Sequence, residues 1–231
     1  RDAAAALPRG ARIAFLGGEP LAVPFAADLC GLALDLGLSP TLFTNGLPLR
    51  DCDLARRIAE LVARGLVVRV SLAGATRDTC DRASGTARFD DAIAGIAALA
   101  AAGARAQVDL MLLPSDVDEV AASLHDLRAL LPPGTVVALG IAFDGGREAG
   151  EHVFPDRTAL ESSLDRVAFG AGERVDAEAP APLAWRREGC TCSLGHHLHV
   201  RSDGALFTCF RMEEPIGDLQ RERFGDALRR L

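Results

Sequence analysis

The sequence predicts an α/β protein: a parallel sheet with helical crossovers, followed by a small C-terminal β-hairpin module. Two observations lead to this prediction. Strand-like and helix-like segments alternate from residue 11 to residue 143, and Asp203-Gly204, a strong hairpin signal, separates two short alternating segments near the C-terminus. Five strands joined by helices fit either an open doubly wound sheet or an incomplete barrel. In both forms ligands bind at the carboxyl ends of the strands.

Each element follows from a local pattern. Apolar runs predict the strands, and longer amphipathic segments predict the helices, of which two end at Gly65 and Gly103. "RDTCDRAS", residues 77–84, is short and charged, and we interpret it as a loop. The predicted strands are 11–16, 40–44, 66–72, 106–112 and 135–143, and the predicted helices are about 30–36, 53–65, 90–102 and 117–131.

Composition narrows the class of protein. The 231 residues are 49% hydrophobic with a net charge of −7, which favours a soluble globular protein and argues against a nucleic-acid partner held by phosphate contacts. No apolar run approaches the ~20 residues that span a bilayer. The start, "RDAAAALPRG", has no signal-peptide pattern, and the 6 cysteines are too few for a disulfide scaffold. We therefore predict a cytoplasmic protein. "RDAAAALPRG" is typical of a helix end and a turn, so we expect a further segment upstream of Arg1.

Four of the five predicted strands end in glycine beside a polar residue. The four strand ends are Gly17-Gly18-Glu19-Pro20, Thr44-Asn45-Gly46, Ser71-Leu72-Ala73-Gly74 and Asp144-Gly145-Gly146-Arg147. One such stretch by itself is an ordinary turn. Because parallel strands bring their carboxyl ends to one rim, four of them together predict a ligand-binding rim.

Three of these strand ends resemble the radical S-adenosylmethionine (SAM) enzymes. "GGEPL" and "TNG" are similar to that family's strand ends, and "SLAGATRDTCDRASGTARFDDAIAGIAALAAAG" is most similar to its peptide-modifying branch with a SPASM or twitch domain. Asp81-Arg82-x-x-Gly85 resembles the enzymes that act on the pyrroloquinoline quinone precursor peptide. The resemblance covers nearly the whole chain. It implies a partial (β/α)6 barrel over residues 1–170, a linker over 171–189 and a partial SPASM/twitch-like module over 190–231, truncated at both ends.

The resemblance also implies where SAM binds. The backbone of Gly17, Gly18 and Glu19 would contact the SAM amino group, since glycine leaves the carbonyls uncovered by side chains. Pro20 would then fix the exit into the next helix. Asn45, from the "TNG" strand end, belongs to the same implied cofactor site.

Two further SAM contacts are implied on the third strand and after it. Ser71 would bind the ribose or carboxylate of SAM, and Arg82 the carboxylate, which a guanidinium matches in shape and charge. The residues by themselves leave alternatives open: Ser71 as a strand-end hydroxyl bonded to backbone, and Arg82 as a solvated arginine. Ala73 departs from the aspartate often found there in the family.

The family's [4Fe-4S] cluster is bound by the motif C-x3-C-x2-C, and this spacing is absent from the 231 residues. Cys30, Cys52 and Cys80 do not replace it, because they lie in an apolar helix, at a helix start and in the expected loop. We expect the cluster loop upstream of Arg1. The alternative is a degenerate paralogue that has lost the cluster and keeps the fold.

An auxiliary iron-sulfur cluster is implied at the C-terminal hairpin. Cys192 and Cys209 flank that hairpin in the spacing C-x11-G-x4-C, and Cys190 is a third candidate ligand. The C-x-C spacing is too close for Cys190 and Cys192 to share the cluster comfortably with Cys209.

Other interpretations of this region stay open. Cys209 between two phenylalanines fits a small buried hydrophobe. A zinc site built on the nearby histidines is weaker, because one strand seldom supplies a complete ligand set. These residues are Phe207, Phe210, His196, His197 and His199.

The implied function is that of a radical SAM oxidoreductase, which generates a 5′-deoxyadenosyl radical from SAM and modifies a substrate, here a ribosomally made peptide. A cluster-free module that binds a peptide or a partner enzyme is the alternative, and an unrelated α/β-barrel enzyme with a phosphate site is a third hypothesis. Motifs of nucleotide hydrolysis, dinucleotide redox and serine hydrolase chemistry are absent. Asp109 is a candidate polar residue facing a barrel interior, and no catalytic acid or base is predicted.

Overall fold

The computed structural model describes residues 2–141, 157–171, 198–208 and 214–229. These residues form two compact units. One runs from Arg12 through residue 171, and in the other the first residues, up to Ala11, join the C-terminal residues 198–229. Among the described helices, none has the length and apolar character needed to cross a membrane.

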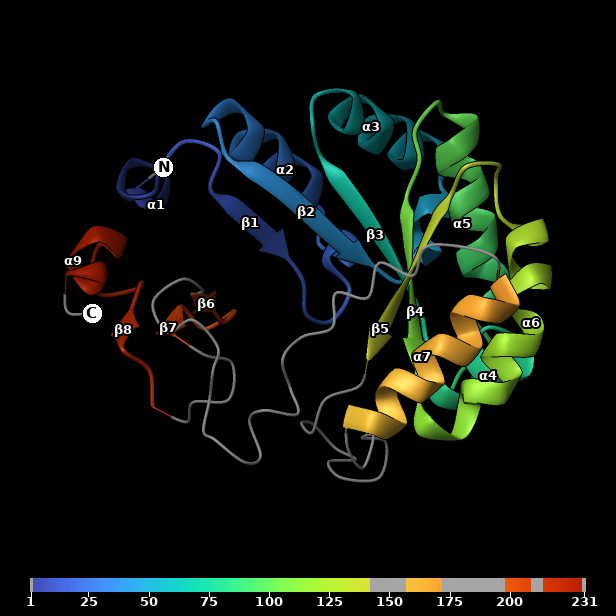
Figure 1. The fold of residues 1–231 in the computed structure, drawn as a ribbon. Helices are drawn as coiled ribbons and strands as arrows, with labels where there is room; N and C mark the ends of the chain where they lie inside the picture. Colours follow the sequence, from blue (N-terminus) through green and yellow to red (C-terminus); the bar gives the residue numbers. More distant parts are fainter. Residues whose placement is uncertain (1, 142–156, 172–197, 209–213, 230–231) are drawn as a thin grey trace. The chain divides into compact units, whose positions relative to one another are not determined.

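The larger unit is a five-stranded parallel sheet in the order β1-β2-β3-β4-β5 (Figure 1). Short 3₁₀ helices, η1 to η3, follow three of the strands, and α-helices form the crossovers. The elements are β1 (Arg12–Phe15), η1 (Pro20–Ala22), α2 (Ala26–Asp35), β2 (Ser39–Thr44), η2 (Leu47–Arg50), α3 (Cys52–Ala63), β3 (Val67–Leu72), α4 (Arg77–Ser84), α5 (Phe89–Ala101), β4 (Gln107–Leu112), η3 (Pro114–Asp116), α6 (Val117–Leu130), β5 (Val136–Ile141) and α7 (Arg157–Ala171).

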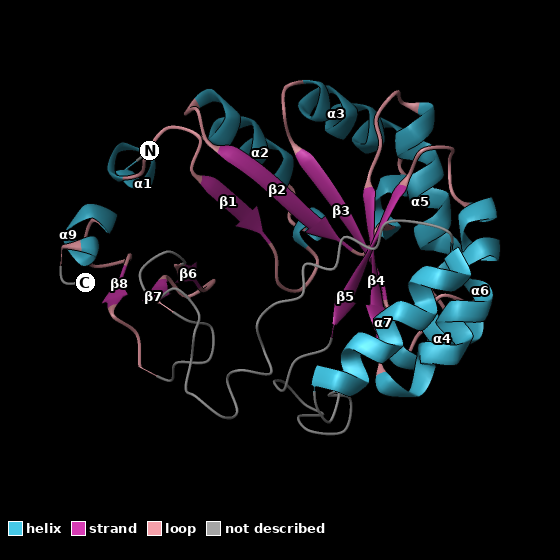
Figure 2. Ribbon diagram, in the orientation of Figure 1, coloured by secondary structure: helices cyan, strands magenta, loops and turns pink. Residues whose placement is uncertain are grey.

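The strand order distinguishes between the two predicted architectures. A doubly wound sheet reverses its order at a switch point, whereas this order follows the sequence without a reversal. Helices α2, α3, α5 and α6 lie along one face of the sheet (Figure 2). The described part of the unit is therefore a partial barrel. The predicted strands and helices are all present, with their ends shifted by a few residues.

Side chains alternate between the two faces of the sheet. Val68, Val70 and Leu72 of β3 are buried on the helix-covered face, while the residues between them, Arg69 and Ser71, are half-buried and exposed. The register aligns Ser71 with Asp109 of β4, and Arg69 with Phe43 of β2 and Gln107 of β4. The second face of the sheet, which we call the open face, thus carries polar side chains at its centre.

The interpretation of residues 77–84 as a loop is wrong. They form helix α4, whose start is fixed by a reciprocal cap between Thr76 and Thr79. The Thr76 hydroxyl accepts a bond from the Thr79 N–H (3.3 Å), and the Thr79 hydroxyl accepts one from the Thr76 N–H (3.2 Å). Cys80, expected in a loop, is buried on this helix. A threonine in place of the usual glutamate or glutamine three residues after the cap conceals the helix signal.

The smaller unit is an antiparallel sheet of β6 (His199–Val200), β7 (Ala205–Phe207) and β8 (Gly217–Asp218), with α1 (Asp2–Ala6) and α9 (Phe224–Leu228). The predicted hairpin is confirmed, with a turn over 201–204 that is closed by a bond from the Gly204 N–H to the Arg201 carbonyl oxygen (2.9 Å), and the Asp203 carboxylate accepts the Ala205 N–H. Asp2 accepts the N–H of Phe224 at 2.7 Å and so ties α1 to α9. The core of this smaller unit is formed by Leu206, Phe224 and Ala227, with Leu7, Leu198, Ile216, Leu219 and Leu228 packed against them.

Candidate functional site

The loop after β1 has an exposed, ligand-accessible backbone. Gly17 and Gly18 are exposed, with φ angles of 91° and 55°, which side-chain-bearing residues rarely adopt. A Cβ placed on either residue would meet no atom within 4 Å. These two glycines are therefore required by the backbone conformation and not by crowding, and the space beside them is open to a ligand.

The Glu19 carboxylate joins the ends of β1 and β2. Its Oε1 accepts bonds from the Leu21 N–H (2.9 Å) and from the Thr44 hydroxyl (2.8 Å), and its Oε2 accepts the Asn45 N–H (2.7 Å). A carboxylate has about four lone-pair positions, so these bonds leave one on Oε2. Pro20 begins η1 directly after this residue.

The loop after β2 is packed tightly against α5. The Asn45 side-chain oxygen accepts the Leu47 N–H at 2.9 Å. Gly46 has a φ of 83°, and a Cβ on Gly95 of α5 would lie 2.0 Å from the Gly46 carbonyl oxygen. The Asn-Gly pair therefore has a structural role in addition to its place at the rim.

Ser71 lies on the open face near the carboxyl end of β3. Its side chain is exposed, and its hydroxyl has no hydrogen-bond partner among the described residues. The alternative interpretation of Ser71, a strand-end hydroxyl bonded to backbone, therefore does not hold among the described residues. Gly74, three residues later, is needed for close packing, because a Cβ there would lie 2.6 Å from the backbone nitrogen of Cys80.

The motif Asp81-Arg82-x-x-Gly85 divides into structural and unassigned positions. The Asp81 carboxylate accepts the N–H groups of Arg88 (2.8 Å) and Phe89 (2.9 Å) at the start of α5, and these bonds hold the pKa of Asp81 below its ordinary value. Gly85 ends α4 with a φ of 69°. Arg82 is exposed and has no ion-pair partner among the described residues. Of the three motif residues, Arg82 is thus the one whose side chain has no structural role among the described residues.

The described cysteines do not fit a metal cluster. Cys30 is fully buried, and this burial raises the pKa of its thiol to about 11. Cys80 is buried on α4, and Cys52 is exposed at the start of α3. No group of three or more histidine, cysteine or acidic side chains among the described residues is arranged to hold a metal ion. The candidate ligands Cys190, Cys192 and Cys209, His196 and His197, and the strand end 144–147 lie outside the described residues.

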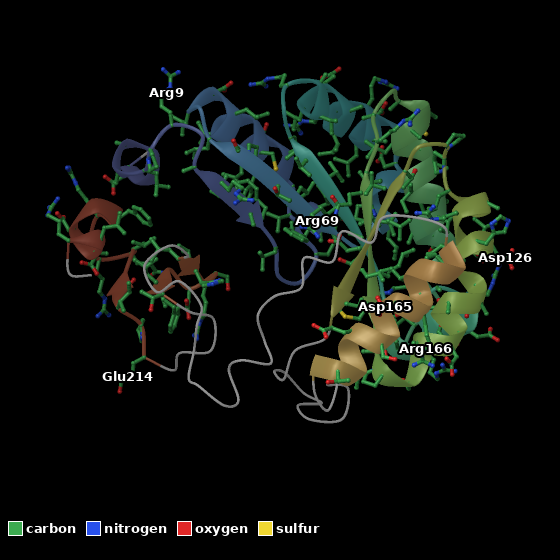
Figure 3. All side chains as sticks on the ribbon, in the orientation of Figure 1. Arg9, Arg69, Asp126, Asp165, Arg166 and Glu214 are labelled. Carbon is green, nitrogen blue, oxygen red and sulfur yellow. The ribbon has the colours of Figure 1, made fainter. Side chains whose placement is uncertain are left out.

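An ion pair at the centre of the open face is only partly anticipated by the sequence. Arg69 of β3 donates to Asp109 of β4 through Nε and Nη2, both at 2.8 Å. Gln107 also donates to Asp109 (3.2 Å), and the Arg69 guanidinium lies 4.9 Å from the centre of the Phe43 ring. Figure 3 shows Arg69 on the side of β3 turned away from the helices. The sequence indicates Asp109 as a polar residue that faces the barrel interior, but it does not predict a role for Arg69. The signal that points to Arg69 is a charged residue placed between two buried valines, Val68 and Val70, of one strand.

No family model and no curated protein sequence matches this chain. Solved structures share its fold. It is similar to anSMEcpe with bound AdoMet (SAM) and Cp18Cys peptide, at 16% identity and a TM-score of 0.68, over 98% of this chain and 69% of that one. It is also similar to SuiB of Streptococcus suis, at 12% identity and a TM-score of 0.65, over 94% of this chain and 55% of that one. SuiB bound to the precursor peptide SuiA has the same identity and TM-score. The chain thus spans about two thirds of anSMEcpe and about half of SuiB.

Proposed function

We propose that this chain forms the SAM-binding and substrate-facing part of a radical SAM enzyme that modifies a ribosomally made peptide. The observation that supports this most strongly is the loop after β1. Its two glycines present bare backbone to open space, and the next residue keeps one carboxylate lone pair available beside them. Among the structures that share the fold, anSMEcpe is bound to AdoMet and a peptide, and SuiB is bound to a precursor peptide, which is consistent with both ligands here.

The residues of the rim fit the polar end of SAM. The carbonyls of Gly17 and Gly18 and the Glu19 carboxylate would accept hydrogen bonds from its ammonium group. Arg82 would pair with its carboxylate, and the exposed Ser71 hydroxyl would bond to its ribose or carboxylate. Bound SAM supplies, after one-electron reduction, a carbon radical that abstracts hydrogen from a substrate. The protein's part is to orient SAM and to keep water from the site.

The iron-sulfur cluster that would reduce SAM does not fit the residues described. C-x3-C-x2-C does not occur in the sequence, and Cys30, Cys52 and Cys80 are scattered over three helices. We therefore assign no cluster ligand in residues 2–141. An auxiliary cluster on Cys209 and one of the two candidates Cys190 and Cys192 stays part of the proposal, as does the cytoplasmic location.

The test is SAM cleavage by the complete product of the natural gene. After anaerobic reconstitution with iron and sulfide, addition of SAM and dithionite should yield 5′-deoxyadenosine. Glu19→Ala should abolish this product, because the ammonium contact is lost, while Glu60→Ala, at an exposed position on α3, should leave it unchanged. Intact SAM with the unmodified protein would contradict the enzyme proposal. It would favour the cluster-free binding module.

A further inference from the structure

Thr44 at the end of β2 carries a buried hydroxyl. The residue is 3% exposed and lies on the face of β2 that also buries Leu42. Valine and isoleucine are the usual occupants of such a position, since they fill the same volume without a polar atom to satisfy. The presence of a hydroxyl there therefore calls for a partner.

The hydroxyl has two partners, and it needs both of its hydrogen-bonding capacities to hold them. It donates to Glu19 Oε1 at 2.8 Å and accepts the Gly46 N–H at 3.1 Å. The result is a short chain of bonds from the loop after β2, through Thr44, to the carboxylate in the loop after β1. No apolar residue of the same shape can replace this link.

This chain of bonds decides how the carboxylate is oriented. With Leu21 and Thr44 both bonded to Oε1, that oxygen has no further lone pair, and the Asn45 N–H occupies one of the two on Oε2. The remaining acceptor position of Glu19 is therefore fixed on Oε2. Without the Thr44 hydroxyl, a second position opens on Oε1, and only the N–H groups of Leu21 and Asn45 restrain the carboxylate about its terminal bond, which has a broad torsional preference.

We propose that Thr44 is a positioning residue for the ammonium group of the bound ligand: it holds the Glu19 carboxylate so that Oε2 faces that group. This inference rests on the proposed function, because it takes the ammonium of SAM as the ligand of Glu19. Thr44 acts through Glu19 and makes no contact of its own with the ligand.

Two adenosine thioethers distinguish a positioning role of Thr44 toward the ammonium group from a general contribution to the structure of the site. S-adenosylhomocysteine carries the amino-acid group, whereas 5′-methylthioadenosine has a methyl group in its place. The variant Thr44→Val should weaken binding of S-adenosylhomocysteine about tenfold or more, the loss expected for a hydrogen bond to a charged group. Binding of 5′-methylthioadenosine should stay within about twofold of the unmodified protein. Thr44→Ser keeps the hydroxyl and should bind both compounds like the unmodified protein.

The measurement is isothermal titration calorimetry on the unmodified chain and on each variant, with circular dichroism to confirm folding. Thr41→Val, on the open face of the same strand, is the matched control and should change neither affinity. Equal weakening of both compounds by Thr44→Val, or no weakening of either, overturns the inference while the proposed function stands. If the unmodified chain binds neither SAM nor S-adenosylhomocysteine, the proposed function fails and the inference fails with it.

Discussion

Arg69 and Asp109 form a bidentate ion pair across β3 and β4, in the middle of the sheet face that no described helix covers. The side chains keep 21% and 15% of their exposure. The interior of a closed barrel is usually filled by branched apolar side chains. A partly exposed charge pair in that position indicates a face that meets a polar ligand or solvent.

Removing one partner of this pair should destabilise the fold. Asp109→Ala leaves the Arg69 guanidinium without its main hydrogen-bond acceptor, and we expect a loss of about 2 kcal/mol in the free energy of unfolding. The double variant Arg69→Ala/Asp109→Ala should lose less than the sum of the single changes, by at least about 1 kcal/mol. Urea denaturation of the four proteins measures this coupling. Strict additivity would show that the two side chains do not interact in solution.

The contact between Gly46 and Gly95 should tolerate no added methyl group. Gly95→Ala places a Cβ 2.0 Å from the Gly46 carbonyl oxygen, so backbone must move. We expect destabilisation of about 1–3 kcal/mol. Gly31→Ala is the matched control in α2, because its Cβ meets only side chains at ordinary contact distances, Leu61 at 3.5 Å and Arg64 at 3.9 Å. It should be neutral or stabilising by about 0.5–1 kcal/mol. Equal unfolding midpoints for the two variants in urea would refute the close contact.

The Asp81 carboxylate at the start of α5 should make the free energy of unfolding depend on pH in the acid range. The pKa of Asp81 is lowered in the folded state by the backbone N–H groups of Arg88 and Phe89. A lowered folded-state pKa stabilises the protein above the unfolded-state pKa, and this stabilisation is lost as pH falls through the folded-state value. Asp81→Ala should therefore unfold more easily than the unmodified protein at pH 7, and the difference should shrink toward pH 3. Asp78→Ala, at an exposed position on α4, serves as the control in the same urea titrations. A difference that stays constant with pH would contradict this assignment.

Thiol reactivity should distinguish the described cysteines. Cys52 is exposed, whereas Cys30 and Cys80 are buried and Cys30 has its pKa raised to about 11. Because the thiolate is the reactive form, iodoacetamide at pH 8 should modify Cys52 in the native protein and the other two only after unfolding. Peptide mapping by mass spectrometry follows each site separately. Rapid native modification of Cys30 would show that α2 is not packed as described.

The sequence predicts the helices and strands of this fold better than the roles of individual residues. Strands such as Val67–Leu72 could be found because their apolar runs are unambiguous. Their order in the sheet could not, since both architectures share the same local pattern. The helix over 77–84 was missed because its cap pairs two threonines.

The rim shows the same limit. The resemblance predicts Glu19 as a ligand-binding residue, and it is also the acceptor that joins two strand ends through Thr44 and Asn45. Arg69 was missed because its partner lies 40 residues away on another strand. Such roles depend on which side chains the fold brings together, and spacing along the chain does not contain that information.

Hydrogen exchange with and without SAM tests the central claim most directly, because it reports where the ligand sits on the chain. If SAM binds at the rim, exchange should slow in peptides that contain residues 16–21, 44–47, 71–76 and the region around Arg82, and should stay unchanged in α6 and α7. Protection confined to other segments, or no protection at a SAM concentration that saturates the protein, would contradict the account.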